Sequence, residues 1–216
     1  ILIFYYKSIA KLSFLNKVIF SMIKDISNKL IKDNEDIAKN FLNAKSKNLN
    51  INCNILNGNF YADSFNYFPI LENLFAFDDL FKRDGNYSYQ HYYSENFFKN
   101  FVKKKNKFKK FDDIYLLGSN VADNFYSNMI HFLPRIFFND QNDIKIAIHR
   151  NLSNKFRKFI HKINEVRKIK YKFVYLDDDF YYFSNSQIPQ FFKLENSVTI
   201  LKNFLLPIDI KGDEKI

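Results

Sequence analysis

The second half of the chain alternates between short apolar segments with the pattern of strands and longer segments with helical spacing. The strand-like segments are 111–118, 143–149 and 171–176, and residues 120–139 and 152–168 between them place apolar side chains at steps of three and four. Short turns separate these segments, and strand–helix–strand units of this kind form right-handed crossovers. The pattern therefore predicts an α/β fold with a Rossmann-like parallel sheet.

The pattern is different before this region. Residues 12–30 repeat apolar side chains at steps of three and four, with lysines on the other faces, which predicts an amphipathic helix within 1–32. Such a helix either packs on a folded surface or lies in the plane of a membrane surface. Residues 33–110 combine a polar linker, a strand near Ile51–Leu56 and an aromatic-rich β region with hairpin signals. The remaining residues, 111–216, are predicted to form the α/β domain.

The composition excludes several classes of protein. Hydrophobic residues make up 47% of the 216 residues, which is more than a disordered chain contains. Only 4 glycines and 4 prolines are present, so collagen-like and glycine-loop architectures are excluded. The single cysteine, Cys53, excludes a disulfide scaffold and a multi-cysteine metal site. The absence of a Walker A motif and of GxGxxG argues against P-loop and NAD enzymes, and no cofactor is expected.

The chain is basic, with a formal net charge of +10. Six lysines lie in the run KKKNKFKK at 103–110, which contains no acidic residue. Such a run is typical of a solvated loop, but it could also contact the phosphates of a nucleic acid or an anionic membrane. Its only aromatic residue is Phe108, which is too few for a base-stacking platform. A non-enzymatic basic module stays an alternative function, with nucleic acid disfavoured as its partner.

The helix predicted at 120–139 carries polar side chains opposite its apolar stripe. Side chains four residues apart stack on one face of an α-helix. At this spacing stand Asp123, Ser127, His131 and Arg135, with Asn124 and Asn128 beside them. Pro134 should kink or end the helix near Ile130 and so aim Arg135 at the mouth of the sheet. Two interpretations stay open: a solvated polar face, or the border of a ligand site at the carboxyl ends of the strands.

The segment 124–136, NFYSNMIHFLPRI, resembles a motif of glycosyltransferase family 61, the capsular-polysaccharide type. The matching positions are Asn124, Phe125, Tyr126, Met129, Ile130, Leu133, Pro134, Arg135 and Ile136. The strand, helix and strand that follow also fit the family, so that the resemblance covers about residues 111–192. It implies the acceptor-side half of a two-domain GT-B enzyme, which transfers a sugar from a nucleotide donor to a glycan hydroxyl with inversion.

The resemblance suggests roles for residues of this segment. Asn124, Tyr126 and Ser127 would border the substrate site, and Arg135 would be a structural or anion-binding group. His131 is the candidate base, since an imidazole transfers protons near neutral pH. Two positions depart from the motif: Ser127 stands where the family has His, and His131 occupies its acidic position. These departures leave open an inactive relative that is retained for partner assembly.

Residues 193–216 do not resemble the half of such enzymes that holds much of the nucleotide-sugar site. We therefore expect the chain to be truncated and inactive by itself. The expected partners are a nucleotide sugar, bound mainly by the missing C-terminal half, and a glycan acceptor. The expected location is cytoplasmic, with peripheral membrane contact through the first helix.

An acidic run, Asp177–Asp179, follows the last strand of the predicted sheet. Its Asp-x-Asp spacing suits a divalent cation that carries a sugar diphosphate. Acidic runs at strand ends are common, however, and no metal site is expected. His149 has no partner at zinc spacing. Further along, residues 198–206 fit either a helix or a strand.

Overall fold

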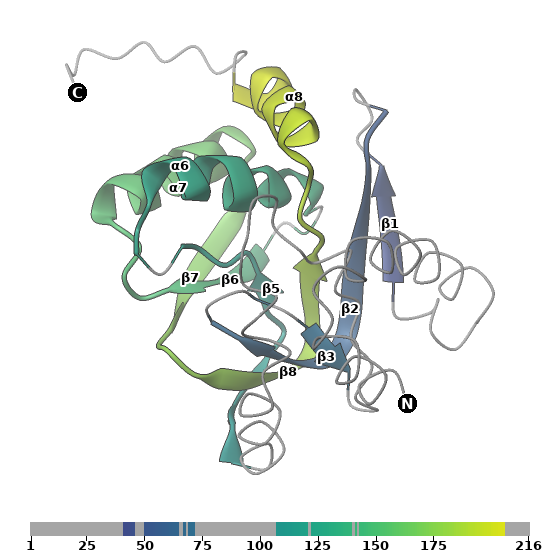
Figure 1. The fold of residues 1–216 in the computed structure, drawn as a ribbon, viewed down its shortest axis with the longest axis vertical. Coiled ribbons are helices and arrows are strands. Elements are labelled where there is room, and N and C mark those ends of the chain that lie inside the picture. The colour runs from purple at the N-terminus through teal and green to yellow at the C-terminus, as the bar shows by residue number, and fades with distance from the viewer. Residues whose placement is uncertain are drawn as a thin grey trace, which may run out of the picture.

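The computed structural model describes residues 41–45, 50–64, 67, 69–71, 107–120, 122–139, 141 and 143–205. The helix predicted within 1–32, much of the aromatic-rich region and the first lysines of the basic run lie outside these residues. The described chain is a mixed α/β structure (Figure 1). Its strands are β1 (Phe41–Lys45), β2 (Asn52–Asp63), β3 (Pro69–Leu71), β4 (Lys109–Asp112), β5 (Tyr115–Leu116), β6 (Asp143–His149), β7 (Lys170–Leu176) and β8 (Phe180–Pro189). Its helical elements are α6 (Phe125–Ser127), a π-helical turn (Asn128–Phe132), a 3-10 helix (Leu133–Phe138), α7 (Asn154–Val166) and α8 (Leu194–Leu205).

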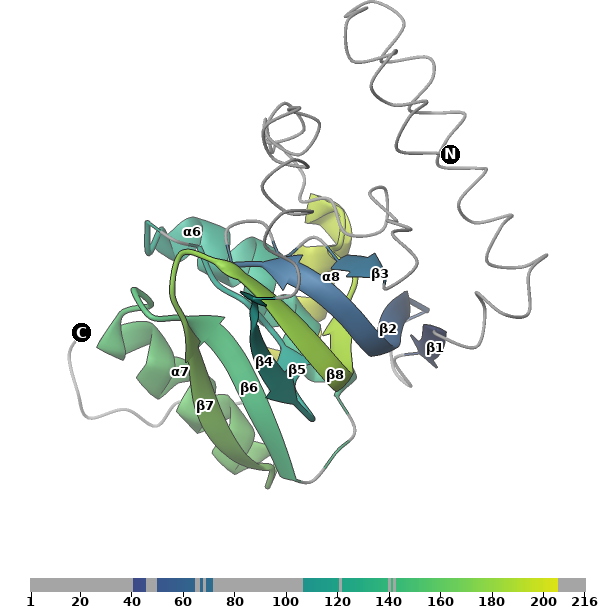
Figure 2. The ribbon, with the colours of Figure 1, turned by 90° about the horizontal axis from the view of Figure 1, so that it is seen from below.

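The described strands belong to one sheet of eight strands. Its main order is β1-β2-β8-β5-β6-β7, with β3 paired to β2 and β4 paired to β8. The strands β8, β5, β6 and β7 pair in parallel, whereas β1, β2 and β3 pair antiparallel. The helices α6, α7 and α8 gather on one side of the sheet (Figure 1), and the view from below places strands in front of them (Figure 2). The predicted α/β class is confirmed.

Alternation along the central strands gives the sheet a core on each face, because successive strand residues point to opposite sides. The helix-side core joins Ile146 and Ile148 of β6 with Ile160 of α7. The strand-side core joins Phe60 of β2 with Phe183 of β8, whose ring centroids are 5.4 Å apart. Full burial of one such side chain stabilises the fold by about 1.5–3 kcal/mol. The two cores hold the carboxyl ends of the parallel strands in place.

The sheet has a corner where β8, β2 and the chain between β4 and β5 each depart from regular strand geometry. Asn185 of β8 has φ +45°, and Asp113, between β4 and β5, has φ +57°. The register of β2 against β8 shifts between Gly58 and Phe60. The amide of Asn185 donates from Nδ2 to Oδ1 of Asp112 at 3.0 Å, which fastens β8 to β4 across the bend. We call this feature the sheet corner.

The corner explains an unusual connection. Only residues 177–179 join β7 to β8, although β6 and β5 lie between these strands in the sheet. Figure 1 shows β8 running across the lower part of the molecule before it turns upward beside β2. The first half of β8 therefore makes the crossing that a helix makes in an ordinary parallel unit. The short connection, which we call the aspartate turn, follows the carboxyl end of β7.

Three of the elements predicted in the second half agree with the structure. The strand predicted at 143–149 is β6, and 171–176 and 152–168 correspond to β7 and α7. The segment 111–118 is interrupted and forms the end of β4 and all of β5. The ambiguous segment 198–206 lies largely in α8. Among the described residues, no helix is long and apolar enough to span a membrane.

The first half of the chain contributes to the same sheet. The strand expected near Ile51–Leu56 is the first part of the longer β2, which pairs with β8. Lys109 and Lys110, the last lysines of the basic run, lie in β4 rather than in a loop. The sheet therefore crosses the boundary that the sequence pattern places between residues 110 and 111.

Candidate functional site

The loop after β5 is fixed by a close contact between a glycine and a tyrosine ring. Gly118 has φ +75°, and a Cβ placed there would lie 2.8 Å from ring atoms of Tyr67. The hydroxyl of Tyr67 donates to the backbone oxygen of Ser119 at 3.1 Å. Only glycine adopts this φ without strain and leaves room for the ring. The ring of Tyr67 therefore packs directly against the carboxyl end of β5.

Amide side chains hold the next part of this loop. The buried Asn128 accepts from the backbone N–H of Asn120 at 2.7 Å and donates to the carboxylate of Asp123 at 3.2 Å. Asn120 also donates from Nδ2 to Oγ of Ser127 at 3.3 Å. Asn124 caps the helix, because its Oδ1 accepts from the backbone N–H of Ser127 at 3.0 Å. These bonds place residues 124–127 beside the end of β5.

The helical segment 125–138 is not a single α-helix. It passes from α6 through a π-helical turn into a 3-10 helix, and each type advances by a different angle per residue. The prediction that Asp123, Ser127, His131 and Arg135 share one face is therefore wrong. The expectation that Pro134 ends the α-helix near Ile130 is also wrong, because the α-helical part already ends at Ser127 and the chain continues through Pro134 as a 3-10 helix. Pro134 lies in the first turn of the 3-10 helix, where its missing N–H costs little.

Arg135 points toward the strand ends, as expected from the sequence, and is completely buried, which fits the structural role rather than the anion-binding role suggested for it. Its guanidinium donates to the carbonyl oxygens of Leu117 at 2.7 Å, Leu116 at 3.2 Å and Pro189 at 3.0 Å. It also lies over the ring of Phe191, 4.2 Å from the centroid. Arg135 thus ties the ends of β5 and β8 together.

The other predicted site residues are spread over the first turns of this segment. Asn124 is exposed, and so is Tyr126, with 61% of its surface open to solvent. Ser127 and His131 are half-buried. Asn124 and Ser127 join each other through the helix cap.

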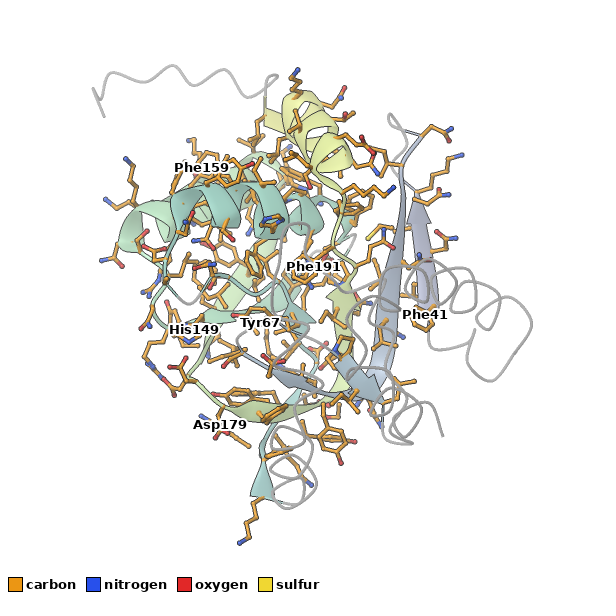
Figure 3. All side chains as sticks on the ribbon, viewed as in Figure 1. Phe41, Tyr67, His149, Phe159, Asp179 and Phe191 are labelled. Carbon is orange, nitrogen blue, oxygen red and sulfur yellow. The ribbon has the colours of Figure 1, made fainter. Side chains whose placement is uncertain are left out.

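A second group of polar side chains lies at the carboxyl ends of β6 and β7. The imidazole of His149, only 2% exposed, has its Nε2 at 2.7 Å from Oδ1 of Asp178. Its Nδ1 accepts the backbone N–H of Asn151 at 3.1 Å, so that the proton of the neutral ring is on Nε2 and is donated to Asp178. The backbone N–H of His149 donates to Oγ of Ser119 at 3.0 Å. Figure 3 shows His149 near Tyr67, with Asp179 at the adjacent turn.

A second acid–base pair fastens the same turn. Arg150 donates from Nε to Oδ1 of Asp177 at 2.5 Å and from a terminal nitrogen to Oδ2 at 3.3 Å. This hydrogen bonding lowers the pKa of Asp177 below its ordinary value. Arg157 of α7 donates to the backbone oxygen of Arg150 at 2.7 Å and lies over the ring of Tyr175. Asp177 therefore has a structural role, because both of its oxygens are engaged by one guanidinium.

The three carboxylates of the aspartate turn do not converge. Asp177 faces Arg150, Asp178 faces His149, and Oδ1 of Asp179 accepts the backbone N–H of Phe180 at 2.8 Å. In the described part of the chain, no group of three or more His, Cys, Asp or Glu side chains could hold a metal ion. The three carboxylates of the run thus form two acid–base pairs and one hydrogen bond within the turn.

The polar side chains at the start of the helical segment and those at the ends of β6 and β7 are linked through Ser119. Its hydroxyl contacts His149 at the end of β6, and the next residue, Asn120, contacts Ser127 at the start of the helical segment. The carboxyl ends of β5, β6 and β7 therefore share a connected polar network, with an exposed carboxylate at Asp178 and an exposed phenol at Tyr126. Such a surface can bind hydroxyl groups, and its carboxylate can accept a proton.

Sequence reasoning treated His149 and the aspartate run as separate and missed their contact. The signal was nevertheless present. The segments 143–149 and 171–176 were both predicted to be strands of one parallel sheet, and the carboxyl ends of neighbouring parallel strands meet at one edge. His149 pairs with Leu176 in register, so the residues after Leu176 follow beside it. Nothing in the sequence pattern indicated that the buried Asn128 would bond both Asn120 and Asp123.

Comparison with protein-family models, curated proteins and solved structures gave no significant match.

Proposed function

We propose that this chain is the acceptor-side α/β domain of an inverting glycosyltransferase with a nucleotide-sugar donor and a glycan acceptor. Its parallel strands and helices would then be the first, Rossmann-like half of a GT-B enzyme. The observation that carries the proposal is the bond between Asn120 and Ser127. It places the segment that resembles the transferase motif at the carboxyl end of β5, where open α/β sheets bind ligands.

The exposed side chains of this segment suit a sugar acceptor. Phe125 and Tyr126 expose 58% and 61% of their surface, although large aromatic residues are usually buried. A tyrosine ring offers an apolar face for the C–H groups of a sugar and a hydroxyl for hydrogen bonds. Ser127 and Asn124 add a hydroxyl and an amide beside it. In this proposal Tyr126 contacts the acceptor and Arg135 supports the strand ends from within.

Transfer of a glycosyl group also needs a base for the acceptor hydroxyl and a group that stabilises the leaving phosphate. His131 was the base candidate from sequence, and it is half-buried on the π-helical turn. In GT-B enzymes, which the motif resembles, the second half holds much of the donor site, and we assign no donor-binding residue in the described chain.

The test uses the product of the full gene. The protein is incubated with uridine, guanosine and cytidine sugar nucleotides and a panel of oligosaccharides, and release of the nucleotide and acceptor binding by saturation-transfer NMR are both measured. We expect turnover with one donor and acceptor pair, and an approximately 5-fold weaker acceptor affinity in Tyr126→Ala, in line with the loss of one stacking contact of about 1 kcal/mol. Leu194→Ala, a comparably exposed apolar residue on α8, is the matched control.

Each outcome of this test has a defined meaning. Acceptor binding without transfer supports the inactive relative that the departures at Ser127 and His131 suggest. No binding and no transfer with any pair contradicts the proposal.

One observation favours the alternative of a basic binding module. The ammonium groups of Lys109 and Lys110 lie over the rings of Phe111 and Tyr182, at 5.2 Å and 5.6 Å from the centroids, so that two lysines of β4 stand beside aromatic rings of β4 and β8. If phosphate contacts were the function, binding to DNA or anionic vesicles would fall steeply with salt. An alanine version of the six lysines in 103–110 would lose that binding. Unchanged binding in this variant excludes the alternative.

A further inference from the structure

Among the three carboxylates of the aspartate turn, the side chain of Asp178 differs in its environment. It is 55% exposed, and its Oδ1 is held at 2.7 Å by Nε2 of the buried His149. Asp177 instead has both oxygens bound by Arg150, and Asp179 turns one oxygen to the backbone N–H of its own neighbour. In the described part of the chain, Asp178 is thus the carboxylate of this turn that an imidazole orients from behind.

His149 is itself held by three hydrogen bonds, one from its backbone and two at its ring. Its backbone N–H donates to Ser119, its Nδ1 accepts from the backbone of Asn151, and its Nε2 donates to Asp178. Because both ring nitrogens are engaged within the protein, His149 has no free nitrogen for a ligand. The bond from Nε2 engages Oδ1 of Asp178, whose side chain is 55% exposed, and we assign Oδ2 as the oxygen that is left for a substrate.

We infer that Asp178 is the general base of the transfer, and that His149 is a positioning residue that orients it. This inference rests on the proposed function. In the step, Oδ2 of Asp178 takes the proton of the acceptor hydroxyl while the acceptor oxygen forms a bond to the anomeric carbon of the sugar. The bond from that carbon to the phosphate oxygen breaks on the opposite side, and the electron pair stays on that oxygen as the nucleoside phosphate leaves.

Location supports this assignment. Asp178 follows the carboxyl end of β7, and His149 ends β6, so the pair stands at the edge of the parallel sheet where ligands bind. The network through Ser119 and Asn120 connects the pair to Ser127, which lies one residue from the exposed Tyr126. The alternative role of the pair is structural, as a second fastener of the aspartate turn beside Arg150 and Asp177.

The experiment separates these two roles with a matched control. Asp178→Asn removes the base. Asp177→Asn instead weakens the ion pair with Arg150 at the preceding residue, whose side chain has a similar exposure of 59%. We expect Asp178→Asn to lower kcat by 100-fold or more with KM changed less than about 3-fold, because general base catalysis typically contributes 10²–10⁴-fold. We expect Asp177→Asn to retain kcat within about 3-fold. Melting temperatures of both variants show that they remain folded.

The positioning role has its own readout. His149→Gln can still donate a hydrogen bond toward Asp178, whereas His149→Leu cannot. We expect His149→Gln to retain at least 10-fold more kcat than His149→Leu at equal KM. Equal loss in both variants overturns the positioning role. If the two buried substitutions prevent folding, Asp178→Asn alone decides, since its side chain is exposed.

The outcomes distinguish this inference from the proposed function. Turnover by the wild type with undiminished kcat in Asp178→Asn overturns the inference and leaves the proposed function intact. Turnover that is abolished in His131→Gln but not in Asp178→Asn transfers the role of base to His131. Absence of any turnover or acceptor binding in the wild type contradicts the proposed function itself, and the inference fails with it.

Discussion

Arg135 shows at the residue scale how a charged side chain can be part of a core. It is fully buried, donates to three backbone oxygens and lies over the ring of Phe191. Its removal leaves buried acceptors without donors, each at a cost of about 1–3 kcal/mol. We therefore expect Arg135→Met to lower the free energy of unfolding by about 3 kcal/mol or more in urea titrations. Arg150→Met, at an exposed ion pair, should cost less than about 1 kcal/mol, and a similar loss in both variants would contradict this role.

Burial also determines the chemistry of the Cys53 thiol. Burial raises the pKa of its thiol from 9.0 to about 12, with partial opposition from the charge of Arg135. A thiol whose pKa is raised by folding stabilises the protein fully below the unfolded value, and this stability is lost as the pH rises from 9.0 toward about 12. We expect Cys53→Ala to remove part of the decline of stability in this alkaline range. The native thiol should also resist a disulfide reagent at pH 8 until urea unfolds the protein, and rapid native labelling would contradict its burial.

At the scale of elements, the sheet corner depends on a residue with a left-handed backbone. Asn185 has φ +45°, which asparagine tolerates better than most residues, and its amide bonds Asp112. We expect Asn185→Gly to cost about 1 kcal/mol, because only the hydrogen bond is lost. Asn185→Ala should cost more, about 2 kcal/mol, because strain at φ is added. Urea titrations of both variants test this order, and the reverse order would show that the corner does not depend on the backbone of Asn185.

The loop after β5 is a second element that depends on one residue. Gly118→Ala adds strain at φ +75° and a clash with the ring of Tyr67. We expect a loss of about 2 kcal/mol or more in the free energy of unfolding. In a Tyr67→Ala background the clash is absent, so the same substitution should cost only about 1 kcal/mol. Equal costs in both backgrounds would contradict the close contact.

At the scale of the whole molecule, the strands of both halves of the chain share one sheet and two cores. β2 pairs with β8, and Phe60 of β2 stacks on Phe183 of β8. We expect Phe60→Ala and Ile148→Ala, one in each core, each to cost about 3 kcal/mol. Because the sheet is continuous, far-ultraviolet circular dichroism and tyrosine fluorescence should give coincident urea transitions in both variants. Separate transitions for the two probes would show that the cores unfold independently.

Local pattern predicted the second half of the fold well and the site only in part. The alternation in DIKIAIH and the helical spacing after Leu152 indicate which face of each element is buried. Each element type has its own fixed period, so these patterns could be recognised without knowledge of the tertiary contacts. The prediction of one polar face at 123–135 was wrong because it assumes an α-helix throughout, whereas the segment changes helix type twice. Asn124 and Ser127 lie at the carboxyl end of β5, where ligands of open α/β sheets bind. Arg135 is instead buried, and its guanidinium donates to three backbone carbonyls.

The sequence alone determined the strands at 143–149 and 171–176 and the helix between them, because their apolar periodicity is local and complete within each element. Tertiary structure decided the sheet order, the bend at Asn185 and the meeting of His149 with Asp178. These features depend on contacts between residues far apart in the chain, which no local period encodes. The same holds for the burial of Arg135, since its three acceptors belong to strands whose ends meet only when the sheet is assembled.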